Sequence, residues 1–145
     1  MLRPHLVLAL AVVASVVTMA LAGDDAPDKG KPTRKTLSER DIAEKLDGKK
    51  ATATTLEVTL EPGQASAPHR HPGPVFGYVL EGEYEWAIDD QAAKTLKAGD
   101  TFYEPTGCLH RVSKNPSDKN KARVLAVVLH PRDVKDIVIP EKKKD

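Results

Sequence analysis

The chain has 145 residues, a length that allows one domain and little more. Its 22 Lys and Arg nearly balance its 21 Asp and Glu, so charge gives no case for a nucleic-acid partner. The single cysteine, Cys108, cannot form an internal disulfide, so the core must hold the fold without covalent links.

Residues 1–22 have the features of a secretory signal peptide. A basic start with Arg3 precedes an apolar run over residues 6–21, and small Ala20 and Ala22 stand just before an acidic stretch. We expect cleavage after Ala22, export to the periplasm or the medium, and no stable membrane insertion of the mature chain. An uncleaved anchor is the alternative, since the run is near the lower length limit for a bilayer span.

Residues 23–50 are expected to form a linker and a short N-terminal segment. Residues 23–36 carry many charges, two prolines and little to bury, as flexible linkers do. In residues 37–46, Ser38 could cap a short helix that ends at Gly48, and an irregular segment is the alternative.

From residue 51 onward, side chains alternate with the two-residue period of a β-strand. Turn residues such as Gly82 and Gly99 separate the strand-like runs about every 8 to 12 residues, which predicts an antiparallel sandwich or barrel. These runs cover residues 52–60, 75–80, 83–88, 95–96, 101–104, 109–113 and 122–129. The barrel domain is therefore expected over residues 51–140, with a basic tail at 141–145.

Two histidines, His69 and His71, lie two positions apart in this region. Side chains at i and i+2 of a strand point to the same face, so both imidazoles can reach one point. Convergent imidazoles are a poor choice for a core, because buried polar rings need partners. Neutral imidazole is, however, the commonest protein ligand of late first-row metals. The pair alone is weak evidence for a metal site, and its surroundings strengthen it.

Glycines, a proline and the histidines keep the spacing of two conserved sequence motifs of the cupins. The segment that resembles the first motif contains Gly63, His69, His71, Val75 and Gly82. The segment that resembles the second motif contains Gly99, Asp100, Pro105, Gly107 and His110. The resemblance covers about residues 56–129 and departs at the closing asparagine, which stands at Asn115. It implies an all-β double-stranded β-helix in which His69, His71 and His110 bind one divalent metal ion at the mouth of the barrel.

The family's usual fourth metal ligand is a glutamate, and here its position is Val75. One interpretation is a neutral three-histidine site with open positions, similar to that of some cupin dioxygenases that use iron. The other is a carboxylate from Glu104, which shares a strand face with Phe102 and points into the barrel if Phe102 does. A strand-end Glu104 bent out to solvent by Pro105 is the alternative.

If the metal is catalytic, the expected activity is that of a small-molecule dioxygenase or other oxidoreductase on a chelating ligand, with Glu104 or a metal-bound hydroxide as the base. Fe²⁺ is the first expectation for the metal, and Mn²⁺, Zn²⁺, Ni²⁺ and Cu²⁺ are alternatives. Binding of a small ligand or of the metal without catalysis is the second function that fits. A homodimer is expected because cupins commonly pair through edge strands.

Other side chains near the motifs are expected to have structural roles. His130 lies outside both motifs and is expected at the surface or behind the metal ligands. Cys108 is expected to fill a turn, and a reactive thiol near the metal is the alternative. Val75 and Gly77 share the histidine face, which predicts an apolar and roomy cavity wall there.

Overall fold

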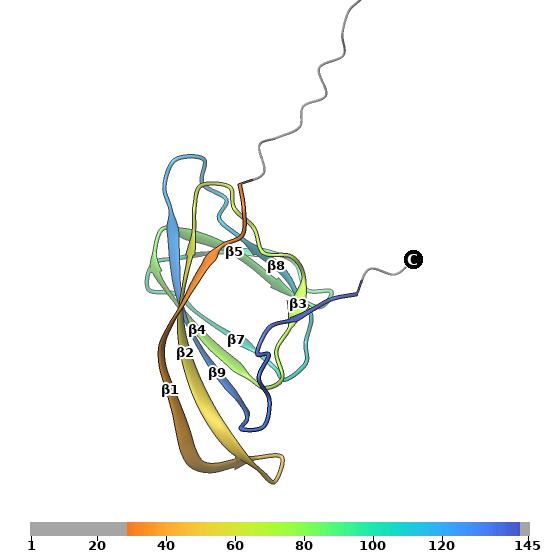
Figure 1. The fold of residues 1–145 in the computed structure, drawn as a ribbon. Helices are drawn as coiled ribbons and strands as arrows, with labels where there is room; N and C mark the ends of the chain where they lie inside the picture. The colour runs from red at the N-terminus through yellow and green to blue at the C-terminus, as the bar shows by residue number, and fades with distance from the viewer. Residues whose placement is uncertain (1–28, 143–145) are drawn as a thin grey trace, which may run out of the picture.

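The computed structural model describes residues 29–142, which form two five-stranded antiparallel sheets that face each other (Figure 1). The strand order is β1-β2-β9-β4-β7 in the first sheet and β10-β3-β8-β5-β6 in the second. The strands are β1 (Thr33–Leu46), β2 (Lys49–Leu60), β3 (His69–Arg70), β4 (Val75–Glu81), β5 (Glu83–Ile88), β6 (Lys94–Lys97), β7 (Thr101–Glu104), β8 (His110–Lys114), β9 (Ala122–Pro131) and β10 (Ile139–Pro140). The chain passes repeatedly from one sheet to the other, which confirms the expected all-β double-stranded β-helix.

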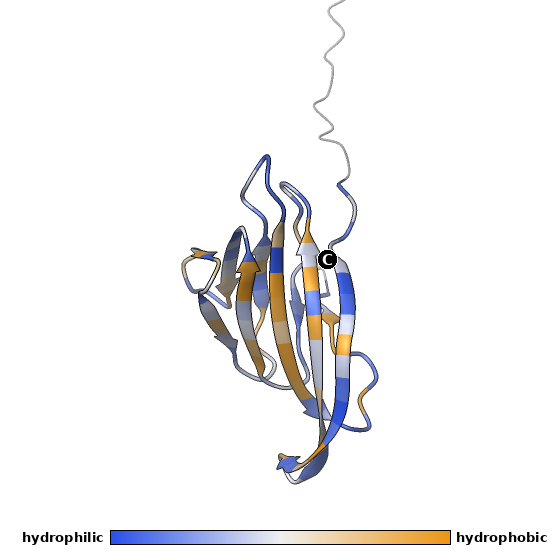
Figure 2. Ribbon diagram, turned by 90° about the vertical axis from the view of Figure 1, so that its left-hand side faces the viewer, coloured by the Kyte–Doolittle hydropathy of each residue, from blue (hydrophilic) through white to orange (hydrophobic). Residues whose placement is uncertain are grey.

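Side-chain alternation explains why these strands enclose one core. In β4, Val75 and Val79 are buried, while Phe76, Tyr78 and Leu80 lie on the outer face. Apolar and polar bands also alternate along the long strands in Figure 2. The core between the sheets consists of Leu56, Leu60, Val75, Val79, Tyr84, Trp86, Ile88, Phe102, Ala122, Val124 and Val128.

The N-terminal segment differs from the sequence-based expectation of a short helix or irregular segment. Residues 37–46 belong to β1, which pairs antiparallel with β2. Asp47 and Gly48 connect the two strands with φ angles of 51° and 76°, the left-handed geometry that a tight hairpin requires. An Asp-Gly pair can end a helix or turn a hairpin, and long-range strand pairing decides which forms. The sheet therefore begins at Thr33, inside the expected linker and before the expected barrel start at residue 51.

Part of the predicted organisation lies outside the described residues. This holds for the signal peptide over residues 1–22, for linker residues 23–28 and for tail residues 143–145. Cleavage after Ala22 and export therefore stay predictions. Within residues 29–142 there is no helix long and apolar enough to cross a membrane.

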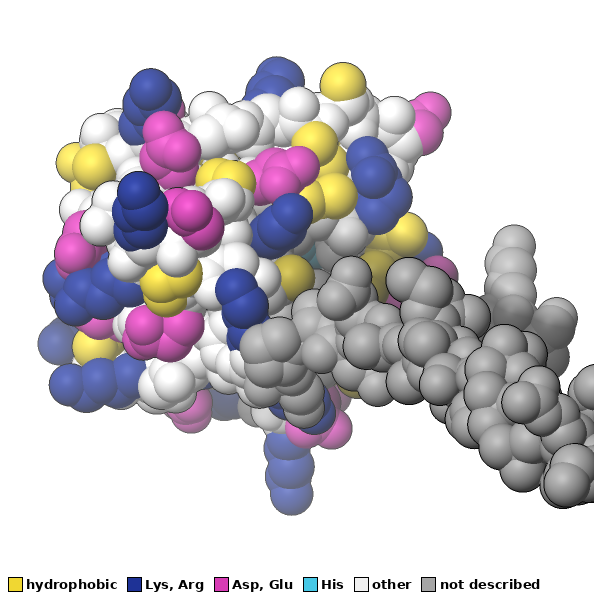
Figure 3. Space-filling view, turned by 90° about the horizontal axis from the view of Figure 1, so that it is seen from above, with side chains coloured by type: hydrophobic (Ala, Val, Ile, Leu, Met, Phe, Trp, Pro, Cys, Tyr) yellow, Lys and Arg dark blue, Asp and Glu magenta, His cyan; other side chains and the backbone are white. Residues whose placement is uncertain are grey.

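Charged side chains of both signs are interspersed over the face of the molecule seen in Figure 3. Some charged side chains of the described residues form ion pairs: Nε of Arg123 lies 2.9 Å from Oε1 of Glu57, and Nε of Arg70 lies 2.9 Å from Oε2 of Glu141. Exposed pairs of this kind contribute little to stability, because water screens them. The mixture matches the near balance of charges in the sequence.

The displaced motif asparagine, Asn115, is fully buried and joins three chain segments at one end of the barrel. Its Nδ2 donates to the carbonyl oxygens of Leu60 at 3.0 Å, Glu61 at 3.2 Å and Asn120 at 2.8 Å. Its Oδ1 accepts a hydrogen bond from the backbone nitrogen of Ser117 at 3.0 Å. The shift by one position therefore leaves this side chain with all its polar atoms satisfied.

Candidate metal site

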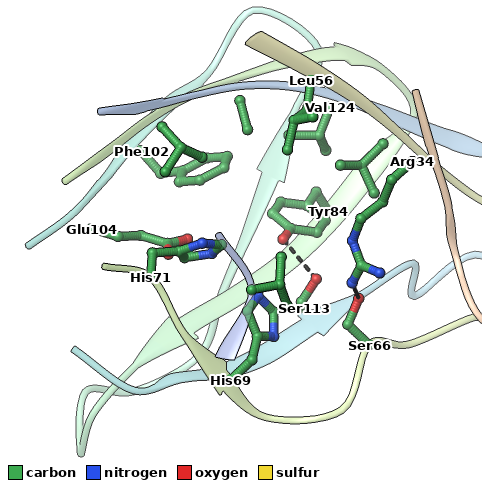
Figure 4. Close-up of a pocket in the computed structure, with 14 residues that line it drawn as sticks. Arg34, Leu56, Ser66, His69, His71, Tyr84, Phe102, Glu104, Ser113 and Val124 are labelled. Carbon is green, nitrogen blue, oxygen red and sulfur yellow. Dashed lines mark hydrogen bonds and ion pairs between the residues drawn. The ribbon is translucent and has the colours of Figure 1, made fainter. Parts of the chain in front are cut away.

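Three histidines converge between the two sheets. His69 in β3 stands opposite His110 in β8, and His71 follows β3. Their exposed fractions are 6%, 5% and 9%, respectively, and their ligand nitrogens all lie within 4.8 Å of one another. Figure 4 shows the rings of His69 and His71 turned toward the same pocket, as the i, i+2 spacing predicts.

A backbone carbonyl orients each of the first two rings. Nδ1 of His69 donates to the carbonyl oxygen of Ala67 at 2.8 Å, and Nδ1 of His71 donates to that of Ile137 at 2.6 Å. Because a carbonyl can only accept, the ring proton is on Nδ1 in both cases and the lone pair is on Nε2. Both imidazoles are therefore held in a tautomer that can bind a metal.

Tyr84 and Ser113 hold the third histidine, and sequence reasoning missed both residues. The Tyr84 hydroxyl donates to Oγ of Ser113 at 2.8 Å, and its oxygen lies 3.3 Å from Nε2 of His110. Nε2 of His110 therefore faces the Tyr84 hydroxyl, while its Nδ1 lies on the side of Glu104. Tyr84 stands two residues before Trp86, so the two side chains share the inward face of β5. This spacing is the sequence feature that could have identified Tyr84.

Burial lowers the pKa of all three imidazoles, to about 4 for His71 and about 3 for His110. For His110 the next largest cause is repulsion from His69 and His71. The three rings are therefore neutral near pH 7, which is the form in which imidazole binds metals.

Glu104 ends β7 and points inward, with 1% of its side chain exposed. In the sheet it stands directly opposite Val75 of β4, the position at which cupins commonly have their glutamate. The carboxylate is thus present on the same inner face, one strand away from its usual position. The alternative of a Glu104 bent out to solvent is wrong, because the strand continues through Glu104 with unbroken alternation.

The carboxylate of Glu104 lies beside two of the histidines. Its Oε1 accepts from Nε1 of Trp86 at 3.1 Å and lies 3.1 Å from Nδ1 of His110. Its Oε2 lies 3.6 Å from Nε2 of His71. Burial raises the pKa of Glu104 to about 7, and the hydrogen bond from Trp86 opposes this rise. The carboxyl group therefore titrates near neutral pH.

Two buried side-chain atoms of the described residues have no hydrogen-bond partner, and both belong to this site. They are Nδ1 of His110 and Oε2 of Glu104. Such orphaned atoms are rare in folded proteins, and a cation among the three rings would satisfy the lone pair on His110. Glu104 is outside the group of ligand atoms that lie within 4.8 Å of one another. The residues therefore fit a three-histidine metal site with Glu104 as its neighbour.

A cavity of about 40 Å³ adjoins the cluster. Leu56, Val124 and Phe102 form part of its wall, as Figure 4 shows, which confirms the expected apolar surroundings. The expected room beside Gly77 is absent, because the Phe102 ring fills it: a Cβ added at Gly77 would lie 2.0 Å from Cζ of Phe102. A large ligand therefore cannot lie entirely within this inner cavity.

Neither His130 nor Cys108 belongs to the group of side chains that could hold the metal ion. His130 is buried at 4% exposure, so the expectation of a surface position is wrong. Its Nδ1 donates to the carbonyl of Pro131 at 3.0 Å, and its Nε2 accepts from the hydroxyl of Thr54 at 2.9 Å. Burial raises the pKa of the Cys108 thiol to about 11, so the thiol stays protonated, as a turn-filling residue would.

Two antiparallel sheets around a buried histidine cluster define the chain as a double-stranded β-helix protein. Its sequence matches the cupin domain over residues 56–128, just over half of the 145-residue chain. The chain therefore belongs to the cupin family. A comparison with curated proteins found no match.

Solved structures share this fold. They include an uncharacterised conserved protein with a double-stranded β-helix domain from Klebsiella pneumoniae, at 22% identity and a TM-score of 0.59, with 79% of this chain and 90% of that chain covered. An RmlC-like cupin from Desulfovibrio desulfuricans has 20% identity and a TM-score of 0.54, with 83% and 99% covered. An oxalate oxidase in complex with glycolate has 22% identity and a TM-score of 0.54, with 75% and 54% covered. At these identities the likeness shows a common fold.

Proposed function

We propose that this protein binds one divalent metal ion through His69, His71 and His110 and uses it to oxidise a small chelating molecule. The observation that carries the proposal is the convergence of three buried imidazoles: a backbone carbonyl accepts the ring N–H of His69 and of His71, and the ligand nitrogens of all three rings lie within 4.8 Å of one another. Core packing gives no reason for three such rings to converge, whereas metal binding does.

Fe²⁺ is the metal that this proposal expects first, and Mn²⁺, Zn²⁺, Ni²⁺ and Cu²⁺ are the alternatives. When bound, the ion supplies a Lewis acid and, as iron, the electron transfer that oxygen-dependent chemistry requires. Three neutral ligands leave the positive charge of the site uncompensated, which favours chelating or anionic ligands.

Glu104 is the proposed base of the reaction. In the metal-free protein a pKa of about 7 lets its carboxyl group take up and release a proton near neutral pH, and a bound cation would lower this pKa and favour the carboxylate form that acts as a base. Trp86 fixes Oε1 by a hydrogen bond, which leaves Oε2 to accept a proton from a ligand in the site. The apolar wall around the inner cavity limits access of water to this carboxyl group, and a low dielectric strengthens its interactions.

The oxalate oxidase shows that a protein with this fold can carry out an oxidation. Its identity of 22% is too low to transfer a reaction, since one fold hosts many chemistries. The proposed reaction class therefore rests on the three-histidine site and on Glu104.

Oxygen uptake by the iron-loaded protein tests the proposal, with diketones, flavonols and thiols as substrates. We expect uptake with at least one of them, loss of uptake in His110→Ala, and retention in His130→Gln. His130 is the matched control because it is buried but bonds to Thr54 and Pro131. Uptake that survives His110→Ala would contradict the proposed site.

Binding without catalysis is the second candidate function, and the size of the inner cavity favours it. About 40 Å³ leaves room for few ligand atoms beside an ion. Calorimetric binding of the same compounds to metal-loaded protein, without oxygen uptake for any of them, would support this candidate over the enzyme.

We also propose that the protein acts outside the cytoplasm, because residues 1–22 resemble a signal peptide. The expected result is a mature chain that begins at Gly23 and is recovered from the periplasm or the medium. Intact-mass measurement of the fractionated protein tests this, and a full-length chain that remains in the membrane would contradict it.

A further inference from the structure

A second and larger cavity, of about 310 Å³, opens beside the inner one. Arg34, Ser66, His69 and Val138 line both cavities, so the two meet at these residues. Figure 4 shows Arg34 on the opposite side of the inner pocket from Glu104. A ligand that spans the larger cavity and the inner pocket therefore lies beside both the Arg34 side chain and His69.

The larger cavity has a positive lining. Lys31 and Arg34 contribute to it, and no Asp or Glu does. Among the salt bridges of residues 29–142, none involves Lys31 or Arg34. The acid of the inner cavity is Glu104, which lies across the pocket beside Trp86. In a chain whose charges nearly balance, two unpaired cations at one cavity favour an anionic ligand.

Arg34 is held in place without being neutralised. Its Nη2 donates to Oγ of Ser66 at 3.3 Å, and the backbone nitrogen of Ser66 donates to the carbonyl oxygen of Ser113 at 2.8 Å. A guanidinium group has five N–H donors in a planar fork, so most of its donors are left for a ligand. That fork matches the two oxygens of a carboxylate.

We propose that Arg34 binds the carboxylate of a small organic monocarboxylate that extends from the larger cavity toward the three histidines. This inference rests on the proposed function and narrows its chelating ligand to one that also carries a carboxylate away from the metal. Ala65, Pro68, Val138 and Pro140 line the same cavity, and their apolar surfaces suit an apolar ligand body.

Arg34 lies in β1, opposite Val58, and outside the segment that matches the cupin domain. Its position therefore follows from the pairing of β1 with β2, which the two cupin motifs do not include. In this protein, an added edge strand supplies the group that selects the ligand.

Calorimetric titration with acetate, butyrate and benzoate, each compared with its amide, tests this inference on the metal-free and the zinc-loaded protein. We expect at least one acid to bind about tenfold or more tightly than its amide. Arg34→Met should remove this preference, and Arg34→Lys should keep part of it, since a lysine is a cation without the planar fork.

Lys35→Met is the matched control. Lys35 is the next residue of β1 and interacts with Glu57, so its removal should leave the preference unchanged. Equal binding of acid and amide, no binding of any of the three acids at millimolar concentration, or an unaltered preference in Arg34→Met would each overturn the inference. Metal content, measured separately on the same samples, tests the proposed metal site. Failure of the ligand inference can therefore be told apart from failure of the proposed function.

Discussion

Val75 and Glu104 are cross-strand partners in β4 and β7, and both side chains are buried on the inner face. The two-residue period of a strand could identify Glu104 as a candidate site residue, because it places Glu104 on the same face as Phe102. It could not show that Glu104 stands opposite Val75, since that depends on the register of two strands distant in sequence. At the scale of single residues, the carboxylate of the site is thus displaced by one strand rather than lost.

Replacing Glu104 by glutamine tests its role while it preserves the shape of the side chain. We expect Glu104→Gln to weaken metal affinity or activity at least about tenfold, because the variant cannot accept a proton at Oε2. Metal titration and steady-state turnover are the measurements. Glu83→Gln, at an exposed pair with Lys97, is the control. A Glu104→Gln protein that retains both properties would show that the carboxylate has a purely structural role.

Tyr84→Phe removes the hydroxyl beside Nε2 of His110 and keeps the buried ring. Groups that orient a metal ligand typically affect affinity by about 10- to 100-fold, so we expect a loss of at least about tenfold in metal affinity. Tyr78→Phe, on the exposed face of β4, should have no effect. Equal affinity in Tyr84→Phe and wild type would exclude a role for this hydroxyl in orienting His110.

The metal-free protein should lose stability as the pH falls below about 6.5. Folded His71 and His110 have pKa values of about 4 and about 3 against an ordinary value of 6.5, so the unfolded chain binds more protons in this range. Each additional proton bound by the unfolded chain lowers the free energy of unfolding by about 1.4 kcal/mol per pH unit. Glu104, with a pKa raised to about 7 from 4.5, acts in the opposite direction between these two values, but it is one group against three.

Urea unfolding of chelator-treated protein at about pH 7 and about pH 5 measures this dependence. The double variant His71→Asn, His110→Asn should show a smaller difference between the two pH values. A free energy of unfolding that is the same at both values in the wild type would mean that the histidines are not held neutral in the folded chain.

At the scale of elements, the contact between Gly77 in β4 and Phe102 in β7 closes one side of the inner cavity. Gly77→Ala should destabilise the protein by about 1–3 kcal/mol, because the new methyl group would overlap the Phe102 ring. Adding Phe102→Leu should remove the overlap, so the double variant should lose less than the sum of the two single losses. Denaturant unfolding tests both statements, and strictly additive losses would contradict them.

Local sequence pattern predicted some elements closely and failed for others. The runs at 83–88 and 101–104 coincide with β5 and β7, because each combines alternation with a clear turn at its ends. The pattern of residues 37–46 was misleading, because β1 is stabilised by pairing with β2 rather than by its own apolar face. The turn at Asp47 is compatible with the end of a helix and with a β-hairpin, and only the pairing with β2 selects the hairpin.

The same contrast applies to the site. His69 and His71 could be placed by the two-residue period, and His110 by the second cupin motif. The contacts of Tyr84 depend on the pairing of β5 with β8, and the place of Arg34 depends on how the first sheet faces the second, so local spacing could predict neither. Spacing identifies groups that lie close in sequence, whereas the groups that orient them or select a ligand come from elsewhere in the fold.

At the scale of the whole molecule, segments on both sides of the matched cupin domain complete the site. Arg34 precedes residues 56–128, and Ile137, whose carbonyl orients His71, follows them. The segment that matches the cupin domain thus contains the three histidines, while its flanks orient one of them and line the cavities beside it. The expected homodimer stays a prediction, and the edges at which it could form in the first sheet are β1 and β7.

Metal content per chain tests the central claim most directly. The purified protein, analysed by inductively coupled plasma mass spectrometry before and after reconstitution, should hold about one divalent ion per chain, and the variant with His69, His71 and His110 all replaced by alanine should hold none. A wild-type content below about a tenth of an ion per chain would contradict the claim, if it persists after reconstitution with iron, manganese, zinc, nickel and copper.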